Sequence, residues 1–278
     1  MIRPNDVIKY QNISCTSALI NQINFIAQNT KNTWQQKRLL REIQKDTTIG
    51  KIAEHTLKDH IEKHSDYLIL DYDDFRIDNY KKHAPIDSLI YVKDNALIQL
   101  AIKKINNDVV NSPVGALSKS TKRFLIDSKI YTLEIKSTRI RNRHCDSTGS
   151  ISLEKVITDD FLTYPKFFRS VPESISINNW QQYRKYCIAK QKICESITLE
   201  MLHNIELENM YDYYARVYVN ELGNDKFDVF IIGYIGKETF IKKSVVKRMQ
   251  QNGKSERAIY IATSLKNGTP FKTIKNKS

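Results

Sequence analysis

The segment at residues 129–137 places charged side chains inside an otherwise apolar run, and this restricts the possible folds more than any other feature. Its β-branched, aromatic and aliphatic residues are typical of a β-strand. Glu134 and Lys136 are two positions apart, so both project from one face of the strand while Ile135 points to the other. Burying such charges in a sheet is costly unless they are paired or bind a metal ion. The segment therefore predicts a β-strand whose charged face takes part in ion pairing or metal binding.

A second segment of the same kind lies at residues 84–92, where Asp87 follows Pro85 and is surrounded by apolar residues. The proline stands at the start, where its missing N–H does least harm to a strand. Helices are predicted at 16–45, 48–64, 95–110 and 178–210, a short basic helix at 242–250, and further strands at 67–72, 214–221, 227–235 and 258–263. This order predicts an α/β chain with a mixed central sheet flanked by helices.

The length of 278 residues fits one large domain, or a core with an attached lobe. We expect an N-terminal helical segment at residues 1–47 and a core at 48–240. The core would carry an insertion at about 94–128, and a basic C-terminal extension would follow at 241–278.

The charge balance points to an anionic partner. The chain has 44 Lys and Arg against 31 Asp and Glu, a formal charge of +13, and nucleic acid is the commonest partner of a basic protein. An anionic membrane surface, or simply a composition rich in Lys, Asn and Ile, is the alternative. No signal peptide or bilayer-spanning run is visible, and the four cysteines form no close pair. We therefore expect a cytoplasmic protein that does not enter the membrane.

Two short motifs resemble those of a known nuclease family. Pro85-Ile86-Asp87 and Glu134-Ile135-Lys136 are similar to the motif of the PD-(D/E)XK, or restriction-endonuclease-like, nucleases, with one residue inserted between proline and aspartate. That family commonly keeps a glutamate in the preceding helix, where this chain has Glu54. The resemblance covers residues 48–140 by motif and extends to about 235 by element order. It implies the restriction-endonuclease-like core, and it requires an insertion between Asp87 and Glu134.

The resemblance also implies a chemistry. Asp87, Glu134, the backbone carbonyl of Ile135 and Glu54 would hold Mg²⁺, with Mn²⁺ as an alternative. Lys136 would orient or deprotonate the attacking water, or stabilise the transition state by its charge. The expected activity is Mg²⁺-dependent hydrolysis of DNA by an endonuclease of a restriction or other genome-defence system. From the residues alone, Glu54 could equally be a surface residue of an amphipathic helix.

Several residues outside these motifs are candidates for DNA contact. Gln182 and Tyr186 match a Gln-x-x-x-Tyr motif that is similar to one in RecB-type nucleases, and their spacing puts them on one helix face. The predicted DNA-binding residues are Arg139, Arg141, Arg143, Gln182, Arg184, Lys185 and Tyr186. Cutting both strands of a palindrome requires two sites related by a two-fold axis, so a homodimer is expected.

Two alternatives remain open at this point. One is a DNA-binding protein without catalytic activity, in which the acidic motif is coincidental. The other is a nuclease of the same core that acts on DNA ends or on RNA, as a repair enzyme or a toxin would. The catalytic hypothesis depends on one spatial requirement: Asp87 and Glu134 have to meet at a single cation pocket on adjoining strands.

Overall fold

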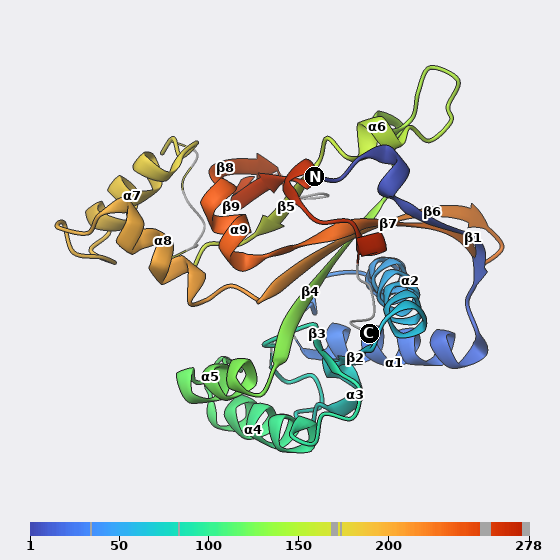
Figure 1. Cartoon of the computed structure of the whole chain (residues 1–278), viewed down its shortest axis with the longest axis horizontal. Helices are drawn as coiled ribbons and strands as arrows, with labels where there is room; N and C mark the ends of the chain where they lie inside the picture. Colours follow the sequence, from blue (N-terminus) through green and yellow to red (C-terminus); the bar gives the residue numbers. More distant parts are fainter. Residues whose placement is uncertain (34, 83, 168–171, 173, 251–256, 274–278) are drawn as a thin grey trace.

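A mixed, curled sheet forms the centre of the molecule (Figure 1). The computed structural model describes residues 1–33, 35–82, 84–167, 172, 174–250 and 257–273. The strand order is β1-β7-β6-β4-β3-β2, and every neighbouring pair is antiparallel except the parallel pair β4–β6. The strands are β1 (Ile8–Ser14), β2 (Tyr67–Asp71), β3 (Ser88–Val92), β4 (Ile130–Arg139), β6 (Tyr213–Gly223) and β7 (Lys226–Gly236).

Helices α1 (Ser17–Thr33) and α2 (Leu40–His64) cover one face of this sheet (Figure 1). Ile52 and Leu57 of α2 pack against Ile135 of β4 and Val217 of β6, so the alternate side chains of each strand point toward the helix. The helix break falls between Thr33, the end of α1, and Leu40, the start of α2, instead of near residue 47. The N-terminal region is also not purely helical as expected, because β1 adds an edge strand that pairs with β7.

The stretch between β3 and β4 forms two helices, α4 (Ile98–Asn111) and α5 (Lys119–Asp127). They lie where an insertion was expected at about 94–128. Ala101, Ile105 and Leu125 bury their side chains against Leu89 of β3 and Ile130 of β4. The two helices therefore have a core of their own on the sheet face opposite α2.

A second sheet contains β5 (Asp160–Thr163), β9 (Arg257–Ser264) and β8 (Val245–Gln250), in that order and antiparallel. Residues 242–250 were expected to form a basic helix, but α9 (Lys237–Lys243) ends there and β8 follows. Residues 241–278 are also no separate extension, because Val246, Ile259 and Ile261 pack with Tyr218 and Phe240 in the largest apolar cluster. The remaining elements are α3 (Tyr72–Phe75), α6 (Leu153–Val156), α7 (Trp180–Ala189), α8 (Leu199–Leu207) and the short 3-10 helices Pro4–Asp6, Asn142–His144, Leu265–Asn267 and Phe271–Thr273.

The two ends of the described chain lie against each other. The Ile2 N–H donates a hydrogen bond to the Lys266 carbonyl at 3.2 Å, and Thr269 forms a bridge with Tyr234 of β7. Phe271 is buried in the cluster beneath α2. None of the helices built from the described residues has both the length and the apolar character needed to cross a bilayer.

Candidate active site

Strands β3 and β4 separate at one end, and Asp87 lies in the resulting fork. Their pairing runs from Tyr91 opposite Ile130 to Ser88 opposite Leu133, and Asp87 is the residue just before β3. Its Oδ2 accepts a hydrogen bond from the backbone N–H of Ile135 at 3.1 Å. Asp87 was expected inside a strand at 84–92. It instead lies immediately before β3. There it accepts the hydrogen bond of the Ile135 N–H, which has no backbone partner on β3 because the two strands separate at this point.

Glu134 is buried beside Asp87, with 6% of its surface exposed. Its Oε1 forms an ion pair with the Lys136 ammonium, whereas its Oε2 is buried without a hydrogen-bond partner among the described residues. Burial raises the pKa of Glu134 to about 7, because the charge of Asp87 adds to desolvation while Lys136 opposes both. Burial likewise raises the pKa of Asp87. Two carboxyl groups and an ammonium group from separate strands thus meet at one place.

Lys136 keeps its proton in this setting. Burial alone would lower the pKa of its ammonium group, but the charges of Glu134 and Asp87 hold that pKa above its usual value. A lysine that is positively charged at neutral pH supplies charge and hydrogen bonds, and it is a poor base. The arrangement therefore favours the electrostatic role over the deprotonating role among those expected for Lys136.

The Glu54 side chain on α2 is largely buried, and the charge of Asp87 acts on it. Its Oε2 lies 2.6 Å from the Lys51 ammonium, which also lies 2.7 Å from Asp73 Oδ2. Burial raises the pKa of Glu54 to about 8; Lys51 opposes the shift, and the charges of Asp71 and Asp87 add to it. The electrostatic effect of Asp87 on both Glu54 and Glu134 joins the helix side of the site to the strand side.

Two members of this group were not identified from the sequence. Asp71 ends β2 with 2% of its surface exposed, and its Oδ1 accepts a hydrogen bond from Ser88 Oγ at 2.7 Å. Lys51 is only 5% exposed and bridges two carboxylates. An acid that closes an apolar strand was the available signal for Asp71. Lys51, three positions before Glu54, looks like half of an ordinary helix-surface pair.

Arg216 is a third residue that the sequence analysis missed. It is the register partner of Lys136 on β6, and it is 6% exposed. Its Nε is buried without a hydrogen-bond partner, and its Nη2 lies 3.5 Å from the Tyr218 hydroxyl. Within the described part of the chain no carboxylate lies within ion-pair distance of Arg216. The nearest counter-charge is that of Asp159, which accepts a hydrogen bond from the Tyr218 hydroxyl and whose pKa the Arg216 charge helps to lower. A buried guanidinium that has no direct ion pair is costly, so this position can accept a further anion.

Two of the arginines at and after the end of β4 form ion pairs with acidic groups. Arg139 contacts Asp46 at 2.8 Å and Glu221 at 2.6 Å, which links α2 to β6. Arg143 contacts Asp159 at 3.0 Å and is more than half exposed. Arg141 lies beside them, where its backbone N–H donates to a histidine ring. Arg139 therefore has a structural role, and contact with a phosphate would compete with its existing pairs.

The residues predicted on helix α7 do not join the site. Tyr186 is 7% exposed within the largest apolar cluster, and α7 packs on α8 and β8. Gln182 accepts a hydrogen bond from the backbone just before the helix, and Arg184 donates to a backbone carbonyl of the following loop. Figure 1 shows α7 well apart from β4. The expected DNA contacts of Tyr186, Gln182 and Arg184 are thus replaced by structural contacts, and Lys185 alone of the four is exposed.

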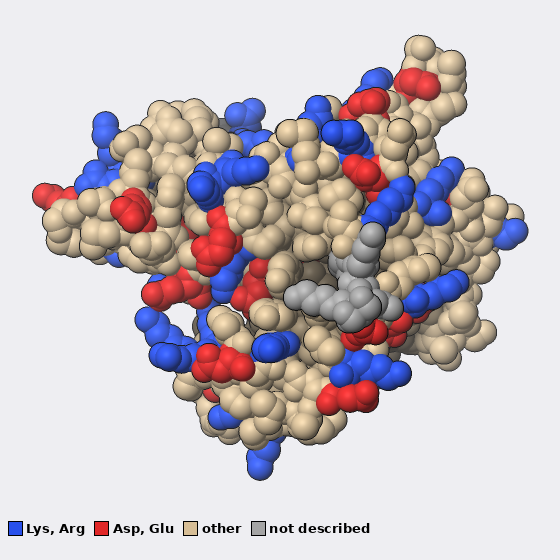
Figure 2. Space-filling model, viewed as in Figure 1, with Lys and Arg blue, Asp and Glu red and all other residues tan. Residues whose placement is uncertain are grey.

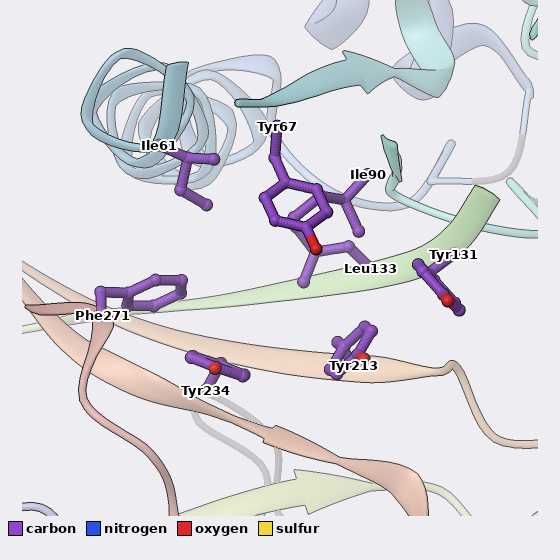
Figure 3. Close-up of a pocket in the computed structure, with 8 residues that line it drawn as sticks. All are labelled: Ile61, Tyr67, Ile90, Tyr131, Leu133, Tyr213, Tyr234 and Phe271. Atoms are coloured by element: carbon purple, nitrogen blue, oxygen red, sulfur yellow. The ribbon is translucent and has the colours of Figure 1, made fainter. Parts of the chain in front are cut away.

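A separate aromatic pocket of about 100 Å³ lies on the α2 side of the sheet (Figure 3). Several tyrosine rings project into it, with Tyr131 and Tyr213 edge to face at 5.6 Å. Its lining consists of Ile61, Tyr67, Ile90, Tyr131, Leu133, Tyr213, Tyr234 and Phe271. These side chains are apolar or phenolic, so the pocket offers no carboxylate ligand and is separate from the chemistry at Glu134.

The carboxylates do not stand in a metal-coordinating array. Among the described residues, no three Asp, Glu, His or Cys side chains are gathered in an arrangement that could hold a metal ion. The Lys136 ammonium contacts one oxygen of Glu134, and the other oxygen is unsatisfied. Comparison with known proteins finds no matching family model, no matching curated protein and no matching solved structure.

Proposed function

We propose that this chain is a metal-dependent nuclease that hydrolyses DNA phosphodiester bonds, as the endonuclease of a restriction or other genome-defence system. The observation that carries the proposal is the meeting of Asp87, Glu134 and Lys136 at the β3–β4 fork. Asp87 and Glu134 come from segments separated by two inserted helices; Glu134 is buried and Asp87 is partly buried, and apolar residues surround both. Desolvated charges destabilise a fold, and they are found most often at functional sites, where they take part in binding or catalysis.

The element order supports the proposed restriction-endonuclease-like core. Helix α2 precedes three antiparallel strands, and two helices then lead to β6, which runs parallel to β4. Glu54 on α2, Asp87 before β3, and Glu134 and Lys136 on β4 occupy the places that the resemblance assigns to them. The inserted helices α4 and α5 account for the long interval between Asp87 and Glu134.

The side chains at the fork are not gathered into a coordination array among the described residues, but their oxygen atoms are of the type that a hard divalent cation takes. Asp87 and Glu134 supply carboxylate oxygens, one of them buried without a partner, and Glu54 is a further candidate. In an extended strand the N–H and C=O of one residue face the same edge. The Ile135 carbonyl therefore faces the fork, as its N–H does. Mg²⁺ held by these groups would acidify a bound water and neutralise charge on the phosphate.

The protein's own cations would act on the phosphate. The Lys136 ammonium group is protonated and forms an ion pair with Glu134. Arg216 is its register partner on β6, and it forms no direct ion pair among the described residues, although Asp159 is near enough to interact with its charge. Both are fixed to rigid strands, so they are placed in advance for the negative charge that develops as the phosphodiester bond breaks.

The test is cleavage of supercoiled, linear and single-stranded DNA, each with Mg²⁺ and with EDTA. The proposal expects nicking or linearisation of the supercoiled form with Mg²⁺ only, and loss of cleavage in Glu134→Gln and Lys136→Met. The exposed Glu154→Gln on α6 is the matched control and keeps full activity. Cleavage of linear DNA while closed circles stay intact would replace the endonuclease by an exonuclease. Metal-independent binding without any cleavage would leave only a DNA-binding protein.

A further inference from the structure

A cleft of about 700 Å³ lies between α5 and the segment that joins α8 to β6. Figure 2 shows a hollow between these two parts of the molecule, bordered by both basic and acidic side chains. A volume of this size is in the range of binding sites for organic ligands. It is far larger than the aromatic pocket on the other face of the sheet.

The cleft adjoins the catalytic carboxylates. Pro85 and Ile86 line it directly before Asp87, and Thr132 lines it two positions before Glu134 on the same face of β4. Tyr211 lies between the two regions: it lines the cleft, and burial together with the charges of Glu134 and Asp87 raises the pKa of its hydroxyl. A ligand in the cleft would thus extend to the β3–β4 fork.

Three lysines from distant parts of the chain meet at this cleft. Lys122 comes from α5, Lys166 follows β5, and Lys237 begins α9. Lys122 donates a hydrogen bond to the backbone carbonyl of Glu208 at 3.0 Å. Burial lowers the pKa of its ammonium group, and the charges of Lys237 and Lys166 lower it further. The fold therefore brings like charges together, which is unfavourable unless an anion joins them.

Most other charged groups in the lining are already paired. The pairs are Lys119–Glu208, Lys237–Asp212 and, one turn apart on α5, Arg123–Asp127. Asp212 is further committed, since its Oδ2 accepts hydrogen bonds from both the N–H and the hydroxyl of Thr132 at 2.9 Å. Lys122 and Lys166 form no ion pair with a carboxylate among the described residues, although the charges of Asp212 and Glu208 act on Lys122 and that of Lys166 acts on the buried Glu206. Glu238 is the remaining acid in the lining and is in no ion pair among the described residues.

We propose that this cleft binds the phosphodiester backbone of the nucleic acid next to the cut, with phosphates contacted by Lys122 and Lys166. The inference rests on the proposed function and adds to it a path by which the strand reaches the fork. Phosphate neutralisation by lysines is the usual, sequence-independent part of nucleic-acid binding. The insertion α4–α5 then has a function, because it supplies one wall of the path.

The experiment measures binding separately from cleavage. A fluorescein-labelled duplex is titrated with protein in the inactive Glu134→Gln background at several salt concentrations, and anisotropy gives Kd. Lys122→Gln and Lys166→Gln are each expected to weaken binding and to reduce the slope of log K against log salt by about 0.9, the value for one lost phosphate contact. Glu238→Gln is expected to tighten binding, because it removes the opposing charge.

The matched control is Lys226→Gln, an exposed lysine at the distant β6–β7 hairpin, which leaves both Kd and slope unchanged. Equal slopes for Lys122→Gln, Lys166→Gln and the control overturn the cleft proposal, even if the wild type cuts DNA. Conversely, flattened slopes in a protein that never cleaves with Mg²⁺ overturn the nuclease and leave the binding cleft standing. Urea unfolding of each variant shows whether a loss of binding arises from loss of fold.

Discussion

Replacing Glu134 with glutamine is expected to stabilise the protein at alkaline pH while it removes activity. The Glu134 carboxyl group is 6% exposed, and one of its oxygens has no hydrogen-bond partner among the described residues. Burial, with the added charge of Asp87, raises its pKa from the usual 4.5 to about 7 despite the opposing Lys136. Glutamine has nearly the same shape and cannot ionise.

The sign follows from proton linkage. A carboxyl group whose pKa is higher in the folded than in the unfolded chain binds its proton more tightly when folded. The contribution of Glu134 to the free energy of unfolding is therefore fully present below about pH 4.5 and is lost as the pH rises to about 7. One pKa unit corresponds to about 1.4 kcal/mol. The ionisation of Glu134 therefore lowers the free energy of unfolding by about 3 kcal/mol at pH 8 and by about 1 kcal/mol at pH 5. Glu134→Gln does not show this decrease in the free energy of unfolding, because glutamine does not ionise.

Urea unfolding in EDTA at pH 5 and pH 8 measures the effect, with the exposed Glu154→Gln as control. The advantage of Glu134→Gln over the wild type is expected to grow by about 2 kcal/mol between the two pH values, whereas the control shows no such change. If the variant is no more stable than the wild type at pH 8, Glu134 is not a desolvated carboxylate, and the electrostatic account of the site is wrong.

Three further outcomes are expected. Lys51→Met leaves the two partly buried carboxyl groups of Glu54 and Asp73 without their shared cation, so it lowers the free energy of unfolding at pH 8 by about 2 kcal/mol, as measured by urea unfolding. Gly233→Ala places a methyl group against Ile2 and 2.6 Å from the Thr269 carbonyl oxygen, so it costs about 1–3 kcal/mol by the same assay. Arg216→Met keeps or raises the Tm, and it lowers the single-turnover cleavage rate by about 100-fold; an unchanged rate would exclude Arg216 from phosphate contact.

The strands that could be predicted from sequence are those with a run of apolar residues, and they include β2 at a sheet edge as well as interior strands. β4, β6, β7 and β9 bury most of their side chains, so apolar runs mark them. β1 and β8 lie at sheet edges, each paired on one side only, and their sequences are rich in lysine and polar residues. Edge strands commonly carry such residues. These strands form because they pair with a neighbouring strand elsewhere in the sequence. The local alternation of apolar and polar residues does not identify that partner.

The site could be predicted only where a local pattern exposes it. The alternation of Glu134 and Lys136 in an apolar strand predicted their shared face, and their resemblance to a nuclease motif added Asp87. Lys51 was missed because its partners come from two different elements. Arg216 did have a signal, as the one charge between Tyr213 and Val219 of β6. The spacing of Gln182 and Tyr186 correctly gave one helix face, but spacing cannot say what that face contacts.

The meeting of the two chain ends has a consequence for how the molecule is made. Strand β1 waits for β7 to emerge before it can pair, and Ile2 is held in place by Lys266, near the other end of the sequence. Contacts between such distant residues form late and slowly. A growing chain on the ribosome would carry every candidate catalytic residue long before the sheet around them could close. The complete central sheet, with β1 paired to β7, can therefore form only after residues 226–236 have been synthesised.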